Sequence, residues 1–469
     1  MNNEKIIFDI SEMLTYLSMY RRYSGIQRVV AMILKEFQNN ENQQVWICFA
    51  KVAGGREKEY FALNIKKSDF QNWESPDLTY DYFVELGILG PGALILKYKN
   101  NKFKYVIHRT RFDLAAHFKK DQRFNKRGVN ISEWKQYRKL EKTDINFVKL
   151  LDVINSNDKL VLLDSTWRLE NIKMYKQVKL IGVNIFTMVY DLIPIISPNM
   201  VHKDLTKNFY KWLYQSADYT DFYISDSESA KGDLVKFLND HKIEKSVTTL
   251  PLVQIGFSIP QKIVQEEKDP IPSDLELLSS LSDLSKTVLS SEYILCVGTI
   301  ELRKNLWRLI LAWKHLLDQG YCDLPRLVIV GRSGWNSENI WSVLNTTANL
   351  YGYVTILNNA TDDELDLLYK NCLFVAMVSL YEGWGLPVGE ALSYGKTAVV
   401  SNATSLPEVG MDLVEYCDPL SIESIAKSIT KLVYQPEYRQ SLEMKIKNTK
   451  LRNWADVAND LRTLLQSKN

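Results

Sequence analysis

Cysteine is scarce in this sequence of 469 residues. The five cysteines lie far apart and no two form a C-x-x-C pair: Cys48, Cys296, Cys322, Cys372 and Cys417. Small disulfide-stapled proteins carry an even set of closely spaced cysteines, and thiolate zinc sites carry paired ones, so both classes are excluded. The cysteine content therefore predicts a protein of a reducing compartment, the cytoplasm.

Metal-ligating patterns are also missing. The five histidines include no pair at i and i+4, and no D-x-D triplet occurs in the chain. The first absence argues against a helical histidine zinc site, and the second against a carboxylate pair that holds a divalent cation. We expect no metal and no other cofactor.

Long apolar runs are absent as well. No run approaches the roughly 18 residues that span a bilayer, and the first ten residues (MNNEKIIFDI) place only three apolar residues before Asp9. We therefore expect neither a secretory signal nor a transmembrane helix. With 46% hydrophobic and 24% charged residues, the composition is that of a folded soluble protein.

The positive charge is concentrated in one segment. The whole chain has a formal net charge of +2, yet residues 101–150 hold 14 Lys and Arg against 5 Asp and Glu. Five of these basic residues are candidates for contact with an acceptor or with an anionic membrane surface: Lys119, Lys120, Arg123, Lys126 and Arg127. A merely solvated helical face explains the pattern at least as well. Nucleic acid is not an expected partner, because no recognisable nucleic-acid module is present.

Apolar, β-rich runs alternate with helical stretches along most of the chain, which predicts parallel sheets with crossover helices. The runs before residue 260 are 6–10, 45–50, 93–98, 160–164, 185–191, 221–225 and 247–252. Those after residue 291 are 293–297, 326–330, 354–357, 373–379, 397–401 and 413–417. The fold class is therefore α/β, with two doubly wound, Rossmann-like domains.

The segment between the two series is rich in Pro, Ser and Asp and includes Asp269-Pro270-Ile271-Pro272. Such a composition is typical of an exposed interdomain connection. We expect an N-terminal domain over 1–260, a linker over 261–291 and a C-terminal domain over 292–440. A helical tail over 441–469 is expected to pack back toward the N-terminal domain.

The most informative stretch is Glu382-Gly383-Trp384-Gly385-Leu386-Pro387-Val388-Gly389-Glu390. It follows an apolar run and leads into a helix, and that geometry favours an anion at the helix N-terminus. The glycines also spell G-x-G-x-x-x-G, so a nicotinamide-binding loop has to be weighed. The run that follows ends without a ribose-binding acid, which disfavours that alternative.

With its surroundings, this stretch resembles the family-four retaining glycosyltransferases of the glycosyltransferase-B fold. The resemblance includes Val297-Gly298-Thr299-Ile300-Glu301-Leu302-Arg303-Lys304-Asn305 and Leu406-Pro407-Glu408-Val409. It is thinner before residue 260, where Gly25-Ile26-Gln27-Arg28 and Tyr190-Asp191-Leu192-Ile193-Pro194 are similar to enzymes that build bacterial surface polysaccharides. The subgroup is that of O-antigen or capsule mannosyl- and rhamnosyltransferases. The resemblance implies two facing domains with a central cleft.

The resemblance also implies roles for particular residues. Glu390 would accept both ribose hydroxyls of the nucleotide, and Glu382 would position the donor sugar over its diphosphate. Arg303 and Lys304, which are expected to open a helix, would bind that diphosphate. The remaining donor-binding positions are Gly298, Thr299, Gly383, Trp384, Gly385 and Leu386. Trp384 replaces the usual Phe, and Thr299 stands where many relatives carry another Arg.

Two further candidates lie before residue 260. Asp191 ends an apolar run and would orient the sugar, although a plain Asx turn before Pro194 is the alternative. Gly25 would bring a backbone N–H to the donor phosphate, although it could equally be an ordinary helix-entry glycine. The roles of both residues are implied by the family resemblance.

The resulting hypothesis is a retaining, metal-independent hexosyltransferase. It would move a sugar from a nucleotide-diphosphate donor to a hydroxyl of a growing bacterial surface polysaccharide or lipid-linked glycan. The implied catalytic residues are Glu382, Asp191, Arg303 and Lys304, and the enzyme would be cytoplasmic, with peripheral membrane contact left open. The alternatives are a non-catalytic bilobed sugar-binding scaffold, or a sugar-phosphate synthase or phosphorylase on the same fold.

Overall fold

The chain forms two compact α/β units. The structure, a computed structural model, describes residues 4–37, 44–50, 59–98, 101–141, 147–255, 281–334, 337–358 and 360–467. Unit 1 comprises residues 1–188, 211–223 and 458–469, and unit 2 comprises residues 189–210 and 224–457. These units divide the chain differently from the boundaries expected from the sequence, which stay a prediction. Residues 261–280 of the expected linker lie outside the described residues, and 283–289 are helical.

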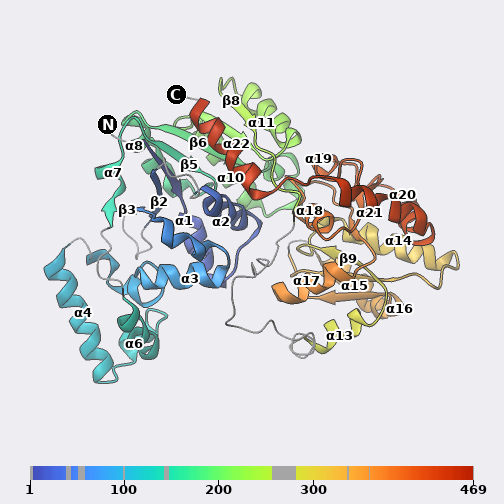
Figure 1. Ribbon diagram of the computed structural model, residues 1–469, viewed down its shortest axis with the longest axis horizontal. Helices are drawn as coiled ribbons and strands as arrows, with labels where there is room; N and C mark the ends of the chain where they lie inside the picture. The colour runs from blue at the N-terminus through green and yellow to red at the C-terminus, as the bar shows by residue number, and fades with distance from the viewer. Residues whose placement is uncertain are drawn as a thin grey trace. The chain divides into compact units, whose positions relative to one another are not determined.

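The first sheet has eight strands in the order β4-β3-β2-β1-β5-β6-β7-β8 (Figure 1). Its strands are β1 (Lys5–Asp9), β2 (Gln44–Ala50), β3 (Tyr60–Asn64), β4 (Val148–Lys149), β5 (Lys159–Leu162), β6 (Asn184–Val189), β7 (Phe222–Ser225) and β8 (Ser246–Thr249). The registered pairs β1–β2, β1–β5 and β5–β6 are parallel, whereas β3 pairs antiparallel with β2 and β4. The predicted parallel sheet is confirmed, with an antiparallel edge that the sequence did not indicate.

One predicted strand is wrong. Residues 93–98 lie in two 3₁₀ helices, Gly90–Leu94 and Leu96–Tyr98. Pro91 has no backbone N–H to give to a sheet, and Gly90 adopts a left-handed φ of 56°. The apolar side chains of this segment, Ile95 among them, instead join the core of a small helical layer.

Helices cover the first sheet and extend beyond it. The helices before residue 255 are α1 (Ser11–Tyr20), α2 (Gly25–Phe37), α3 (Pro76–Glu85), α4 (Lys102–His117), α5 (Gln122–Asn125), α6 (Ile131–Leu140), α7 (Leu150–Val153), α8 (Ile172–Leu180), α9 (Ile193–Ile196), α10 (Lys203–Ser216) and α11 (Glu228–Asp240). Helices α4, α5 and α6 share a core of their own, in which Phe112, Phe124 and Trp134 are buried together. The basic segment is therefore a folded helical layer.

The second sheet has six strands in the order β11-β10-β9-β12-β13-β14. They are β9 (Tyr293–Val297), β10 (Arg326–Val330), β11 (Val354–Leu357), β12 (Val375–Met377), β13 (Ala398–Ser401) and β14 (Glu415–Cys417), and every registered pair is parallel. All six strands fall within the apolar runs predicted for this half. Burial on both faces of the central strands β9, β10, β12 and β13 accounts for their largely apolar sequences.

The helices of this half are α13 (Asp283–Leu289), α14 (Leu306–Asp318), α15 (Glu338–Thr346), α16 (Ala348–Tyr351), α17 (Asp362–Asn371), α18 (Leu386–Ser393), α19 (Leu406–Gly410), α20 (Ile422–Tyr434), α21 (Pro436–Asn448) and α22 (Trp454–Ser467). The predicted helix at 421–434 is confirmed as α20, whose Ile425, Ile429 and Leu432 enter the main core of unit 2. The last residues of α22 belong to unit 1, where Arg462 donates to the Glu36 carbonyl at 2.6 Å.

Candidate functional site

The second sheet reverses its strand order at β9. This strand pairs with β10 on one side and with β12 on the other, so the chain leaves the carboxyl ends of β9 and β12 in opposite directions. Open parallel sheets bind ligands at such a switch point. The segments that emerge there are 298–305 and 378–385, which hold most of the donor-binding residues predicted from the sequence.

The segment after β9 holds its two cations in a tight turn. Arg303 and Lys304 were expected to open a helix after this strand. They lie at the end of a short 3₁₀ helix, Leu302–Lys304, and α14 begins at Leu306. Asn305 separates the two helices with a left-handed φ of 58°. Its buried side chain donates to the carbonyls of Val378 and Pro419 at 2.9 and 2.7 Å, which fixes the turn against the segment after β12.

The segment after β12 has the predicted order of strand, glycine loop and helix. Gly385 precedes α18 with a left-handed φ of 106°. A Cβ at Gly383 would stand 2.6 Å from the Tyr190 carbonyl oxygen, so only glycine allows the loop to lie against the residues after β6. Thr404 and Ser405 bond the backbone of Glu382 and hold the loop in place.

Glu382 lies between the two cations. Its Oε2 is 2.6 Å from Arg303 Nη1, and its Oε1 is 2.7 Å from Lys304 Nζ. Arg303 also pairs with Glu301 at 2.6 Å and donates to the Tyr381 carbonyl at 2.9 Å. The predicted residues Glu382, Arg303 and Lys304 therefore form one charge cluster, in which two carboxylates, with Glu382 buried, face two half-buried cations.

This cluster fixes the ionisation of Glu382. Burial alone would raise the pKa of this carboxyl group, but the charges of Arg303 and Lys304 outweigh it and lower the pKa to about 2. The pKa of Arg303 is raised, because Glu382 and Glu301 overcome the effect of burial. The charged forms of Glu382 and Arg303 therefore stabilise each other.

The absence of a side chain at Gly298 leaves room for the side chain of Lys304 to cross the turn. This glycine has a φ of 148°, and a Cβ built on it would lie 3.1 Å from Lys304 Cε. The lysine side chain therefore passes directly over the glycine before it reaches Glu382. Thr299, next in the chain, is exposed, and its methyl group lies against Gly334 in the segment after β10.

Two more acids, Asp191 and Asp226, lie near the glycine loop. Asp191 accepts the Ile193 N–H at 3.0 Å, which is the Asx turn considered from the sequence, and burial raises its pKa despite the nearby charge of Arg303. Asp226 is 2% exposed, and its Oδ1 has no hydrogen-bond partner among the described residues. Burial and the charge of Asp191 raise the pKa of Asp226 well above its usual range.

Asp226 was missed by the sequence reasoning as a candidate residue. The signal available was its place at the end of β7, between Ser225 and Ser227. Gly383 lies close to it as well, since a Cβ there would stand 3.2 Å from Asp226 Oδ2. The carboxyl ends of β6 and β7 thus contribute acids to the same glycine loop.

Glu390 and Trp384 face inward from the glycine loop and its helix. Glu390 is buried, and its Oε2 accepts a hydrogen bond from the Tyr369 hydroxyl at 2.5 Å. Tyr369 in turn stacks on Tyr394. The Trp384 indole N–H donates to the Val253 carbonyl at 2.8 Å, a bond that the usual Phe could not make. Leu386, which begins α18, is half-buried.

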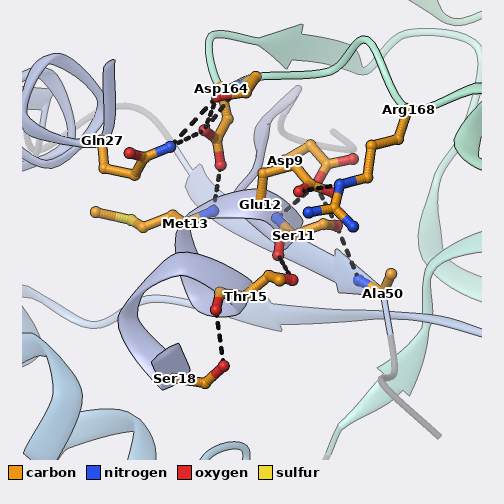
Figure 2. Close-up of polar contacts among 11 residues, drawn as sticks. Asp9, Ser11, Glu12, Met13, Thr15, Ser18, Gln27, Ala50, Asp164 and Arg168 are labelled. Atoms are coloured by element: carbon orange, nitrogen blue, oxygen red, sulfur yellow. Dashed lines mark hydrogen bonds and ion pairs between the residues drawn. The ribbon is translucent and has the colours of Figure 1, made fainter. Parts of the chain in front are cut away.

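Gly25 lies in unit 1, exposed at the start of α2. Two residues on, Gln27 donates to Asp164 Oδ1 at 3.0 Å, while Asp164 Oδ2 accepts the Met13 N–H at 2.5 Å (Figure 2). Asp164 follows β5, which neighbours β1 where the first sheet reverses its order. Burial raises the pKa of Asp164 to about 6. This carboxyl group therefore ties the first turns of α1 and α2 to the switch point.

Asp9 completes the polar cluster drawn in Figure 2. It accepts the Ser11 N–H at 2.8 Å, and Ser11 Oγ accepts the Ala50 N–H at 2.9 Å. Outside the view of Figure 2, Asp9 also accepts the Tyr175 hydroxyl at 2.8 Å. Glu12 pairs with Arg168 at 2.5 Å beside it. Asp9 and Asp164 were not among the predicted site residues, although each directly follows or ends a buried strand.

The five predicted contact residues of the basic segment are all exposed in unit 1: Lys119, Lys120, Arg123, Lys126 and Arg127. The guanidinium groups of Arg123 and Arg127 lie 5.4 and 5.7 Å from the centre of the Phe112 ring. Within the described part of the chain, no group of three or more His, Cys, Asp or Glu side chains is arranged to hold a metal ion. No described helix is long and apolar enough to cross a membrane.

Comparison with protein families decides the identity of the second half. Residues 285–449, which include the whole second sheet and the Glu382 cluster, match the family "Glycosyl transferases group 1". The chain carries a group 1 glycosyl transferase domain. Its two parallel-sheet α/β units are those of the glycosyltransferase-B fold, as the sequence predicted.

Two curated relatives of this glycosyltransferase-domain protein are named as mannosyltransferases. It is 28% identical over 255 residues to the O-antigen chain mannosyltransferase B of Escherichia coli, covering 54% of this chain and 62% of that protein. It is 26% identical over 272 residues to the serotype-specific mannosyltransferase WbdA of Escherichia coli, covering 57% of this chain and 32% of that protein. The match spans less than two thirds of each relative.

Solved structures share the fold at low identity. The trehalose-6-phosphate structure from E. coli, bound with UDP-2-fluoro glucose, has a TM-score of 0.57 at 12% identity and covers 98% of this chain and 99% of that one. Anabaena HepE in complex with UDP and glucose has a TM-score of 0.53 at 13% identity, covering 99% and 100%. The glycosyltransferase from Rickettsia africae has a TM-score of 0.54 at 13% identity, covering 100% of both chains.

Proposed function

We propose that this protein is a retaining, metal-independent glycosyltransferase that uses a nucleotide-diphosphate sugar. The observation that carries the proposal is the charge cluster of Arg303, Lys304 and Glu382 at the switch point of the glycosyl transferase domain. Two cations in a half-buried turn can stabilise the charge that develops on a departing diphosphate. Glu382 is ionised and lies beside them, where it can orient the sugar.

The proposed sugar is a hexose, mannose first, and the proposed acceptor is a hydroxyl of a growing O-antigen chain or related lipid-linked glycan. This proposal rests on the mannosyltransferase relatives, which share about a quarter of the aligned residues. Capsule polysaccharide is a second acceptor of the same chemical class. The five exposed basic residues Lys119, Lys120, Arg123, Lys126 and Arg127 would contact the acceptor or an anionic membrane surface.

In the proposed reaction the bond between the anomeric carbon and the diphosphate breaks through an oxocarbenium-like state. Arg303 and Lys304 stabilise the leaving diphosphate, and its oxygen takes the proton of the acceptor hydroxyl on the same face. The new glycosidic bond then forms with retention of configuration, and no covalent glycosyl-enzyme intermediate is needed. Asp191 and Glu382 orient the sugar, and Glu390 binds the ribose.

A transfer assay tests this proposal. The purified protein is incubated with a lipid-linked glycan acceptor and, in turn, with GDP-mannose, dTDP-rhamnose and a UDP-hexose, in the presence of excess EDTA. We expect one donor to be consumed with transfer to the acceptor, and we expect nuclear magnetic resonance to show the donor's anomeric configuration in the product. Activity lost in EDTA and restored by Mg²⁺ would contradict metal independence, and an inverted product would contradict retention.

A non-catalytic sugar-binding scaffold is the alternative from another class. It would bind the donor without consuming it, and the same assay separates the two functions. The buried carboxylate of Glu382, which Arg303 and Lys304 keep ionised, favours the enzyme, because burying a charge is costly for a protein that gains no chemistry from it.

A further inference from the structure

Helix α4 carries apolar side chains on two opposite faces. One face, with Phe112, Ala115 and Ala116, is buried in the core that α4 shares with α5 and α6. Leu114 stands two residues from both Phe112 and Ala116, which turns it by about 200° to the other side of the helix. Only the first face has a protein partner among the described residues.

The second face is an exposed apolar stripe. Phe103, Leu114 and Phe118 are 76%, 52% and 65% exposed, and Val106 and Ile107 are exposed on the same side. The spacing of four and seven residues between Ile107 and its neighbours at 103 and 114 places them along one line of the helix surface. Isolated exposed apolar residues are normal, but a contiguous stripe with two phenylalanines marks a surface that binds something.

The charge around this stripe selects the partner. Lys104 and Arg111 border it, both are exposed, and neither has an ion-pair partner among the described residues. Two nearby acids, Asp113 and Glu141, both pair with Arg138 at the α4–α6 contact, which leaves the excess of basic side chains only partly offset by the exposed acids Asp121 and Glu133. The stripe therefore lies in a field of positive charge, which residues 101–150 hold in an excess of 14 to 5.

We propose that the exposed stripe of α4 inserts into the headgroup layer of an anionic lipid bilayer. Such a surface offers apolar depth for Phe103, Leu114 and Phe118 and negative charge for Lys104 and Arg111 at once. A second copy of the same face would repel the first by its positive charge, and a water-soluble polyanion would have no use for the phenylalanines. The inference deepens the proposed function, on which it rests for a membrane-linked acceptor.

Vesicle flotation of the full chain, without donor or acceptor, tests the proposal independently of sugar transfer. We expect binding to vesicles of equimolar phosphatidylglycerol and phosphatidylcholine, and weak binding to phosphatidylcholine alone. A triple variant with F103S, L114S and F118S should have a vesicle partition coefficient lower by about tenfold or more, because the three substitutions remove most of the apolar surface that would enter the bilayer. The matched control L180S changes a residue that is 88% exposed elsewhere in unit 1, and it should leave binding unchanged.

A fluorescent label separates insertion from surface attraction. The described cysteines other than Cys322 are buried, so a C322S background allows an environment-sensitive dye to be placed by L114C alone. Blue-shifted emission on anionic vesicles supports insertion. Three outcomes overturn the proposal. The first is emission that does not shift, and the second is vesicle binding that the K104E/R111E double variant loses but the triple serine variant keeps. The third is a dimer of the protein in solution that the triple serine variant, and no other variant, disrupts. Normal transfer to a soluble acceptor alongside any of these would leave the proposed function standing.

Discussion

Lys304 Nζ lies 2.7 Å from Glu382 Oε1, and the two residues are 78 positions apart in the chain. The same carboxylate pairs with Arg303 through its other oxygen. A diphosphate that binds these two cations therefore has to share them with Glu382 or take them over. This competition makes Glu382 a residue whose removal should affect diphosphate binding and sugar transfer in opposite directions.

The first prediction concerns Glu382→Gln. It should lower kcat by about tenfold to a hundredfold, since a hydrogen bond to a charged group contributes roughly 1.5 to 3 kcal/mol. The affinity for free nucleoside diphosphate should stay the same or rise, because the amide no longer neutralises Arg303 and Lys304. Steady-state kinetics and calorimetry measure the two effects. Glu301→Gln is the matched control, since Glu301 pairs with Arg303 alone; equal loss of nucleotide affinity in both variants argues against the roles assigned here.

The second prediction concerns Gly298. Gly298→Ala should weaken nucleoside diphosphate binding, because its Cβ would stand 3.1 Å from Lys304 Cε and displace the side chain. Gly320→Ala is a control with the same kind of backbone strain, since Gly320 has a φ of 93° and nothing within 4 Å of the added Cβ. Both variants should lose stability, but calorimetry should show reduced nucleotide affinity only for Gly298→Ala. Unchanged affinity in that variant would mean that Lys304 reaches the ligand by another path.

The third prediction is that Glu390 contributes to the binding of the nucleotide and not to the rate of the chemical step. Glu390→Gln should weaken binding of donor and of free nucleotide alike, because a ribose contact is made equally before and during the reaction. Tyr369→Phe removes the hydroxyl that holds the carboxylate at 2.5 Å, and it should raise KM by a smaller factor with little change in kcat. Wild-type affinity in both variants would remove Glu390 from the nucleotide site.

The stability of the protein should depend on pH through Glu382. Its pKa is about 2 when folded against an ordinary value of 4.5, so the folded state holds this proton less tightly than the unfolded chain does. The contribution to the free energy of unfolding, about 3 kcal/mol, is fully present above pH 4.5 and is lost as the pH falls toward 2. Urea unfolding across that range should show a shallower pH dependence for Glu382→Gln than for the wild type. Parallel curves would show that the two cations do not hold the carboxylate as described.

The second half of the fold was predictable because its strands are short, apolar and buried on both faces. The runs at 293–297, 326–330 and 354–357 match β9, β10 and β11 at both ends. The first half was harder, since the antiparallel edge pairs β3 with β4, a strand of two residues that lies far along the chain. The 3₁₀ helices at 90–98 had the apolar content of a strand, and only Pro91 and the flanking glycines argued otherwise.

The residue types of the candidate site could be named from the sequence, but their contacts could not. Nothing in the spacing of Arg303, Lys304 and Glu382 indicates that one carboxylate lies between both cations. Asp226 gave a weaker signal still, because a buried acid between two serines reads as part of a turn. Its unpaired oxygen becomes visible only when the end of β7 is placed beside Gly383.

The central claim is that Arg303 and Lys304 hold the diphosphate of a nucleotide sugar at the switch point of the second sheet. Calorimetry of GDP, dTDP and UDP with the wild type and with Lys304→Ala tests it most directly. We predict that one of these nucleotides binds the wild type and binds Lys304→Ala about tenfold or more weakly, as expected for a lost charge-assisted hydrogen bond, while the matching nucleoside binds both proteins equally. Equal binding of the diphosphate by wild type and variant would contradict the claim.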